Sequence, residues 1–220
     1  MLLSLLPLQV VALAASLSLH GLLPAPPPGA ALDVTAAALG AQDAMGEPVS
    51  VVLYDANHKD TYRVTINRDG TIDDDAREIL RHAFRCRRSE REHKIDQGLL
   101  AMIADVQAHW PGKTIEYISA YRGWRGERRT SPHRAGIALD FRIPGVKLTE
   151  LRDYVWGRFE HVGVGWYPTR DFVHMDHRGD KDDIAWTEVH GSNRYNPSWS
   201  KRVRAGVPTP PRVHHSRVGL

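Results

Sequence analysis

Short segments with alternating apolar and polar residues predict strands in the central part of this chain, and longer segments with apolar residues at helical spacing predict helices. In residues 137–143, for example, Ile137, Leu139 and Phe141 share one face. Strands are predicted at residues 49–55, 61–67, 114–121, 137–143, 162–167 and 172–176, and helices at residues 73–88, from residue 96 or 97 to before Pro111, and at residues 148–159. This order predicts an α+β fold, with a small, mainly antiparallel sheet and helices packed on one face.

The first 32 residues contain no Lys, Arg, Asp or Glu, and residues 2–23 are almost wholly apolar. The length of this stretch lies between that of a signal-peptide core and that of a membrane-spanning helix. We therefore expect residues 1–32 to be a signal peptide, which is cleaved, or an N-terminal membrane anchor, which is retained. Because no basic region precedes the apolar stretch, we also expect the true start of the protein to lie upstream.

The rest of the chain divides into three parts by composition. Small, sparsely charged residues predict a tether at residues 33–48, after a proline-rich exit from the apolar segment. The predicted strands and helices place a folded domain at residues 49–190. Residues 191–220 contain six Lys and Arg residues, four prolines and no acidic residue, and they predict a basic flexible tail.

Composition limits the class of protein only loosely. The chain has 220 residues, 42% hydrophobic and 25% charged, which is an ordinary globular balance with room for one sizeable core. The net charge of +3 and the pI of about 9.1 favour an acidic partner, such as nucleic acid, an anionic membrane or a polymer that carries carboxylates. The export segment and the absence of a nucleic-acid motif oppose nucleic-acid binding. The single cysteine, Cys86, excludes an internal disulfide and is expected to be structural.

Two short segments supply candidate metal ligands. The segment SPHRAGIALD at residues 131–140 places His133 and Asp140 seven apart, and FVHMD at residues 172–176 adds His174. A catalytic zinc site takes three His, Asp or Glu ligands and leaves a fourth position open for water. By strand alternation, Asp140 leaves the core side of its strand, and His174 and Asp176 share the polar side of theirs. The spacing alone is weak evidence in a chain with twelve histidines, but it predicts metal-assisted hydrolysis.

These segments also carry a resemblance to a known family. SPHRAGIALD matches the S-x-H-x-x-G-x-A-x-D pattern of the D-alanyl-D-alanine metallopeptidases. GVGWYP followed by FVHMD resembles their YcbK-like murein endopeptidase branch, and ISAYR at residues 118–122 extends the match. The resemblance implies a fold shared with lysostaphin-type peptidases and the hedgehog signalling domain, one zinc ion, and peptidoglycan as the partner. It implies an exported protein, either periplasmic or anchored to the outer face of the cytoplasmic membrane.

The resemblance also implies roles for single residues. His133, Asp140 and His174 would bind the zinc ion. Arg122 would be both catalytic and substrate-binding, because it would hold a substrate carboxylate or stabilise the transition-state oxyanion. The structural alternative for Arg122 is a salt bridge that closes the end of its strand.

The general base is harder to assign. Many members of the family carry a glutamate three residues before the last histidine, where this chain has Asp171. Because residues two apart on a strand share a face and residues three apart do not, Asp176 is the better neighbour for the metal and is assigned as catalytic. Alternatively, Asp176 orients a zinc-bound imidazole.

Three further residues are assigned to substrate binding, namely Tyr121, Trp166 and His177. His177 stands where the YcbK-like enzymes carry a small polar residue, and the loop at residues 123–130 is shorter than theirs. We therefore expect a zinc-dependent peptidoglycan peptidase that hydrolyses stem-peptide or cross-link amide bonds, a murein endopeptidase. The alternatives are a D-Ala-D-Ala carboxypeptidase and a catalytically silent, zinc-stabilised module that binds the cell wall.

Overall fold

The structure, a computed structural model, describes residues 46–206. The predicted signal peptide or anchor at residues 1–32, all but the end of the predicted tether, and the chain after residue 206 lie outside the described residues. Within residues 46–206, no helix has the length and apolar character that crossing a membrane requires.

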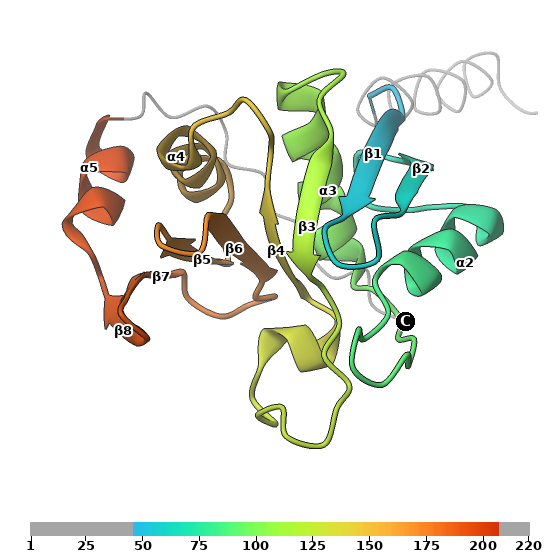
Figure 1. Cartoon of the computed structure of the whole chain (residues 1–220). Helices are drawn as coiled ribbons and strands as arrows, with labels where there is room; N and C mark the ends of the chain where they lie inside the picture. The colour runs from blue at the N-terminus through green and yellow to red at the C-terminus, as the bar shows by residue number, and fades with distance from the viewer. Residues whose placement is uncertain (1–45, 207–220) are drawn as a thin grey trace, which may run out of the picture. The chain divides into compact units, whose positions relative to one another are not determined.

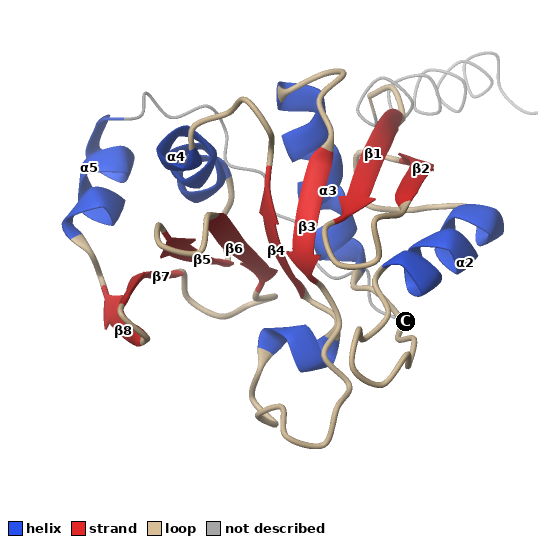
Figure 2. Cartoon of the chain, viewed as in Figure 1, coloured by secondary structure: helices blue, strands red, loops and turns tan. Residues whose placement is uncertain are grey.

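The described part of the chain is an α+β fold, with helices and strands interleaved along the sequence (Figures 1 and 2). The strands are β1 (Val49–Asp55), β2 (Thr61–Ile66), β3 (Ile115–Ser119), β4 (Ala138–Arg142), β5 (Val162–Tyr167), β6 (Phe172–His177), β7 (Ile184–Val189) and β8 (Ser192–Tyr195). The helices are α2 (Asp74–Ala83), α3 (Gln97–His109), the short 3₁₀ helix η1 (Pro132–Ala135), α4 (Leu148–Arg158) and α5 (Ser198–Gly206).

The strands of residues 46–206 form one eight-stranded sheet in the order β2-β1-β3-β4-β6-β5-β7-β8. Two neighbouring pairs, β1–β3 and β5–β7, are parallel, and the other pairs are antiparallel. The sheet is therefore mixed, and it is larger than the small sheet that the sequence predicts, because β7 and β8 extend it. The packing of helices on one face stays a prediction.

Helices α2 and α3 each begin where an aspartate provides an N-cap. Asp73 accepts a hydrogen bond from the backbone of Ala76 at the start of α2, and Asp96 accepts one from Leu99 at the start of α3. The sequence predicts that the first helix continues to residue 88, but α2 ends at Ala83. The chain then turns, and the backbone N–H of Cys86 donates to the carbonyl of Arg91 instead of continuing the helix.

Strand alternation in β6 separates the core from the site. Val173 and Met175 are fully buried in the hydrophobic core, which α3 and α4 help to build. His174 and Asp176 extend from the other face of the same strand. The register then sets the position of β4, because Asp140 lies directly opposite His174. Two of the candidate ligands are thus cross-strand neighbours.

The start of the predicted tail is folded. The sequence predicts a flexible tail from Gly191, whereas the described residues 192–206 form β8 and α5. The physical reason is an apolar anchor that the basic composition obscures, because Trp199 is buried in the core. Figure 1 shows α5 beside α4 at one end of the sheet.

Candidate active site

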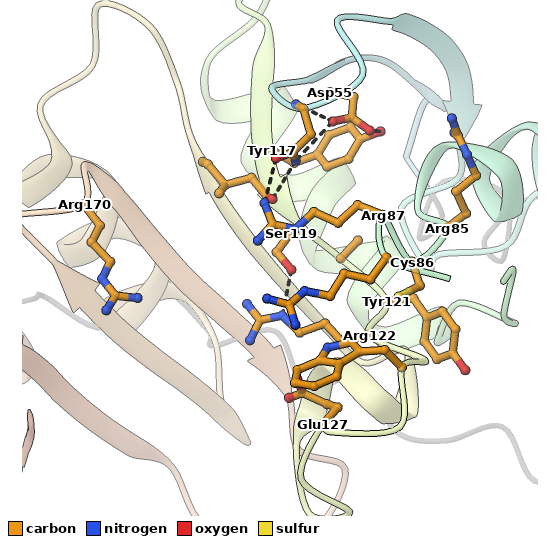
Figure 3. A pocket seen from close by; sticks show the side chains of 15 residues that line it. Asp55, Arg85, Cys86, Arg87, Tyr117, Ser119, Tyr121, Arg122, Glu127 and Arg170 are labelled. Atoms are coloured by element: carbon orange, nitrogen blue, oxygen red, sulfur yellow. Dashed lines mark hydrogen bonds between the residues drawn. The ribbon is translucent and has the colours of Figure 1, made fainter. Parts of the chain in front are cut away.

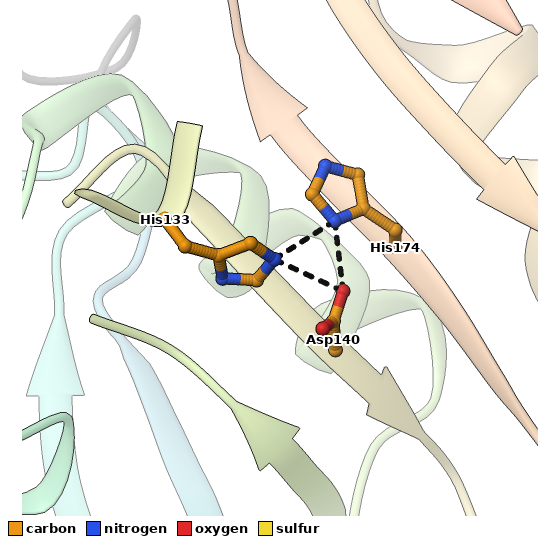
Figure 4. Close-up of side chains that lie close together, drawn as sticks. All are labelled: His133, Asp140 and His174. Atoms are coloured by element: carbon orange, nitrogen blue, oxygen red, sulfur yellow. Dashed lines mark hydrogen bonds and ion pairs between the residues drawn. The ribbon is translucent and has the colours of Figure 1, made fainter. Parts of the chain in front are cut away.

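His133, Asp140 and His174 converge on one point (Figure 4). One ligand atom from each side chain lies within 4.8 Å of the other two, and all three residues are buried. The Nε2 atom of His133 is 3.1 Å from Nδ1 of His174 and 3.2 Å from Oδ1 of Asp140, and Nδ1 of His174 is 2.8 Å from the same oxygen. Two imidazole nitrogens and a carboxylate oxygen form a donor set that could hold a metal ion.

Local backbone structure aims His133 at the cluster. Pro132 occupies the first turn of η1, and Gly136 ends it in the left-handed conformation at φ 69°. The Nδ1 atom of His133 is 2.7 Å from the carbonyl oxygen of Ala120. Because a carbonyl only accepts, Nδ1 carries the proton, and Nε2 is left free to face Asp140 and His174.

The charges in the cluster suit a cation. Burial opposes ionisation of Asp140, but the two neighbouring histidines outweigh it and hold the pKa of Asp140 far below its usual range. Burial lowers the pKa of His133, and the nearby Asp140 offsets this only in part. Burial also disfavours the charged form of His174, yet its hydrogen bonds to Asp140 and Asp176 raise its pKa. A metal ion would replace the proton on His174.

Asp176 lies behind His174 and is 1% exposed. Its Oδ2 atom is 3.0 Å from Nε2 of His174, the ring nitrogen that points away from the other two ligands. Gly163 on β5 makes room for this carboxylate, because a Cβ atom at that position would lie 1.8 Å from Oδ2. Arg178 approaches the other oxygen, Oδ1, at 3.5 Å. The geometry is that of a carboxylate that orients a histidine ligand.

Asp171, the alternative base, lies elsewhere. Its side chain is 67% exposed, and it forms an ion pair with Arg142 at 3.0 Å. It occupies the turn between β5 and β6 with a positive φ of 58°. Asp171 does not line the pocket that contains the three candidate ligands.

Arg122 lies beside the cluster. Its guanidinium forms an ion pair with Oδ2 of Asp140, and its Nε–H donates to the hydroxyl of Ser119 at 2.7 Å. Its backbone N–H donates to the carbonyl of His133. The side chain remains one-third exposed, so it can also reach a bound substrate.

The cluster opens into a pocket of about 590 Å³. The β3–η1 connection contributes Arg122 and Arg128, and the β7–β8 hairpin contributes Trp186 and Tyr195. The ring of Trp186 is 5.0 Å from the ring of His174. Gly165, directly opposite His174 on β5, permits this approach, because a Cβ atom there would lie 2.5 Å from the Trp186 indole. The ligands therefore lie in an open, partly aromatic cleft.

A second pocket adjoins the first and shares Arg122, Glu127 and Arg170 with it (Figure 3). It has a volume of about 210 Å³, and Arg87 and Arg88 also line it. Tyr121, a predicted substrate-binding residue, lines this second pocket and stacks on His93 at 4.6 Å. Cys86 lines it too but is buried and unpaired with any other cysteine.

The other two predicted substrate-binding residues, Trp166 and His177, line neither of these pockets. Trp166 packs against the core, with the guanidinium of Arg152 4.6 Å from its ring. His177 is buried, and its Nδ1 atom is 2.6 Å from Asp96 at the start of α3. Both side chains therefore lie on the face of their strand that points away from the ligands.

Trp186 and Glu188 are among the residues of the cleft that sequence reasoning missed. Both lie on β7, which the sequence analysis does not predict. The signal was present as alternation, because Trp186 and Glu188 are two apart in the segment IAWTEV and so face the same side.

Comparisons with known proteins find a matching family and several relatives. A family profile described as peptidoglycan L,D-endopeptidase MepK matches residues 43–181. The chain is 32% identical over 109 residues to the probable peptidoglycan L,D-endopeptidase MepK of Haemophilus influenzae. The aligned region covers 44% of this chain and 58% of that relative. The chain is 33% identical over 108 residues to the peptidoglycan L,D-endopeptidase MepK of Escherichia coli K12. The aligned region covers 44% of this chain and 59% of that relative. The chain thus spans less than two thirds of the length of these relatives. No solved structure matches it significantly.

Proposed function

Because the chain belongs to the peptidoglycan L,D-endopeptidase MepK family, we propose that it is a metal-dependent murein endopeptidase. The bond it hydrolyses is an amide in the stem peptides or cross-links of peptidoglycan. The relatives are named L,D-endopeptidases, and we assign the same class of bond to this chain.

The observation that carries this proposal is the convergence of His133, Asp140 and His174 from η1, β4 and β6 at the floor of an open cleft. Their nitrogen and oxygen donors fit zinc, which accepts both kinds in a catalytic site with three protein ligands. Zinc bound there would polarise the scissile carbonyl and lower the pKa of water towards about 7.

Residues of the chain itself orient the metal ligands and stabilise the charge that develops on the substrate. Asp176 accepts a hydrogen bond from Nε2–H of His174 and so fixes the ring with Nδ1 towards the other ligands, which is the orienting role that the sequence left open for it. Arg122 holds Asp140 in place and presents the rest of its guanidinium to the cleft. There it is placed to stabilise negative charge that develops on the carbonyl oxygen.

Arginine side chains support an acidic peptide as the substrate. Arg122 lines both the pocket with the ligands and the neighbouring pocket, where Arg87 and Arg88 also lie (Figure 3). Guanidinium groups recognise carboxylates through paired hydrogen bonds. Stem peptides of peptidoglycan carry free carboxylates, which suit this continuous basic surface.

The organisation of the chain follows from the same proposal. Residues 49–206 form the peptidase domain, because β8 and α5 continue the same fold, and residues 1–32 direct export. We propose a periplasmic location, because the substrate lies outside the cytoplasm. Retention of the N-terminal segment as an anchor in the cytoplasmic membrane stays the alternative prediction.

The test uses purified sacculi. The full chain is incubated with sacculi, with zinc and with a chelator, and released muropeptides are identified by mass spectrometry. We expect zinc-dependent cleavage of peptide bonds with intact glycan strands, and a loss of at least about a thousandfold for His133→Ala, because removing a ligand removes the metal. Full hydrolysis by His133→Ala would contradict the site assignment.

The products also separate the alternatives. Release of terminal D-alanine alone would indicate a carboxypeptidase. Binding to sacculi without release of any product, under all metal conditions, would indicate a catalytically silent binding module.

A further inference from the structure

The part of the fold that follows the family match contributes to the cleft. The match ends at residue 181, and the chain then forms β7, β8 and α5. β7 pairs in parallel with β5, and β8 pairs with β7, so this segment extends the same sheet that holds the ligands. The segment is therefore continuous with the peptidase fold.

Buried contacts hold α5 to that fold. The indole N–H of Trp156 on α4 donates to the carbonyl of Ser200 at 2.8 Å, and the indole N–H of Trp199 donates to the hydroxyl of Thr187 at 2.9 Å. Arg204 forms an ion pair with Asp183 at 2.7 Å. These bonds connect α5 to α4 and to β7, so they fix the base of the β7–β8 hairpin.

Glu188 fixes the other end of the hairpin. Its buried carboxylate accepts a hydrogen bond from the backbone N–H of Gly191, in the turn between β7 and β8. The hydroxyl of Thr169, in the turn between β5 and β6, donates to its other oxygen at 3.4 Å. One carboxylate thus joins two neighbouring turns, and the hairpin is held as a preformed wall.

Only one face of β8 meets the cleft. Asn193 and Tyr195 line the pocket with the metal ligands, whereas Ser192 and Arg194, which alternate with them, do not. Tyr195 lies opposite Trp186 across the hairpin, with the ring centres 6.3 Å apart, and it is 57% exposed. Tyr195 and Trp186 therefore place two neighbouring aromatic rings at the cleft.

The order of the sheet places this wall across from the basic side of the cleft. β4 and β6, which carry Asp140 and His174, lie between β3 on one side and β5, β7 and β8 on the other. Arg122 and Arg128 come from the segment after β3. A ligand over the metal site therefore has Arg122 and Arg128 on one side. On the other side it has the rings of Trp186 and Tyr195 and the amide of Asn193, beside the buried Glu188 carboxylate, which pairs with Arg170 at 3.9 Å.

We propose that the β7–β8 hairpin is a substrate-recognition wall, which binds the uncharged face of an extended stem peptide while its carboxylates meet Arg122 and Arg128. Tyr195 packs on the peptide, and the amide of Asn193 hydrogen-bonds to its backbone. The inference rests on the proposed function for the identity of the ligand, and it adds a binding determinant that lies beyond the family match.

The test compares the two faces of β8 in the full chain. Asn193→Ala and Tyr195→Ala remove groups that line the cleft, and Ser192→Ala and Arg194→Gln are matched controls on the same exposed strand. With a soluble cross-linked muropeptide, we expect KM to rise about fivefold to tenfold for each cleft variant with kcat nearly unchanged, because a binding contact is lost and the ligands are not. The controls should keep the wild-type KM.

A second readout does not depend on hydrolysis. The same four substitutions are made in the His133→Ala background, and binding of the muropeptide is measured by calorimetry. Weaker binding in Asn193→Ala and Tyr195→Ala, with unchanged binding in the two controls, would support the wall. This holds even if the wild-type chain cleaves nothing, because the absence of cleavage would count against the proposed function only. The proposal would be contradicted if both cleft variants kept the wild-type KM and affinity, or if the control variants lost as much affinity as the cleft variants.

Discussion

Asp176 connects the metal site to the strand on its far side. The carboxylate contacts Nε2 of His174 on one side, and it fills the space that Gly163 leaves on the other. Its Oδ1 atom is buried and, among the described residues, accepts no hydrogen bond. A group with so little freedom is suited to fixing the orientation of a ring, because any movement of the carboxylate would meet β5.

We expect Asp176→Asn to lower zinc affinity by about 10-fold to 100-fold. The amide keeps the shape of the aspartate side chain but lacks the negative charge that makes the His174 imidazole a stronger metal ligand. Competition with a chromophoric chelator measures this directly. Asp171→Asn is the control, since Asp171 is exposed and paired with Arg142. Unchanged affinity in Asp176→Asn, together with lost hydrolysis in Asp171→Asn, would instead make Asp171 the base.

Between elements, a half-buried ion pair joins α3 to α4. Arg158 donates from Nη2 to Oδ2 of Asp105 at 2.7 Å and from Nε to Oδ1 at 3.0 Å, and the hydroxyl of Tyr154 also donates to Oδ1. Burial alone would raise the pKa of Asp105, but these bonds outweigh it and hold the pKa below the ordinary value of 3.8. The folded state therefore binds the Asp105 proton less readily than the unfolded state.

The direction in which folding stability changes with pH follows from this difference in proton binding. The stability contributed by the Asp105 carboxylate is fully present above pH 3.8 and is lost as the pH falls from there through the lower folded pKa. We expect Asp105→Asn to have a lower free energy of unfolding at neutral pH and a shallower loss of stability in acid. Urea unfolding between pH ~6 and ~2.5 measures both. The control is Asp180→Asn, at an exposed position after β6. Parallel acid profiles for wild type and Asp105→Asn would contradict this account.

Alternation along single strands explains which site residues could be predicted from the sequence. His174 and Asp176 are two apart on β6 and share the cleft, as predicted. His177 is three residues from His174, so the same rule places it on the other face, where it contacts Asp96. Trp166 follows Gly165, the partner of His174, and so it also faces away. These two assignments did not apply the alternation rule, and strand geometry argues against both.

In the molecule as a whole, the buried site couples metal binding to folding. His133, Asp140 and His174 come from distant parts of the chain, and they meet only in the folded state. A ligand that binds the folded state alone stabilises it by mass action, by about 2.7 kcal/mol at a free concentration one hundred times its Kd. We expect zinc to raise the free energy of unfolding by this order, and urea unfolding with zinc and with a chelator measures it. His133→Ala should show no such shift, and an equal shift in that variant would place the metal elsewhere.

The fold class and the order of the strands and α-helices up to β6 could be predicted because alternation and helical spacing are local signals. The end of the fold could not be predicted, because residues 191–206 contain Pro197 and several basic residues and so resemble a solvated tail. Its folding depends on contacts with distant residues, such as that of Trp156 with Ser200. A single buried tryptophan, Trp199, outweighs that composition, and no local pattern reports the surface that it covers.

The hairpin also has a protective role that follows from its place in the sheet. A fragment cut where the family match ends would keep every metal ligand, but β5 would lose its partner β7. Its bare backbone amides and carbonyls would then offer a template for a strand from another molecule. The indole of Trp156 would face water as well. The last strands thus cover the edge of β5, and we expect a shortened version to be prone to aggregate.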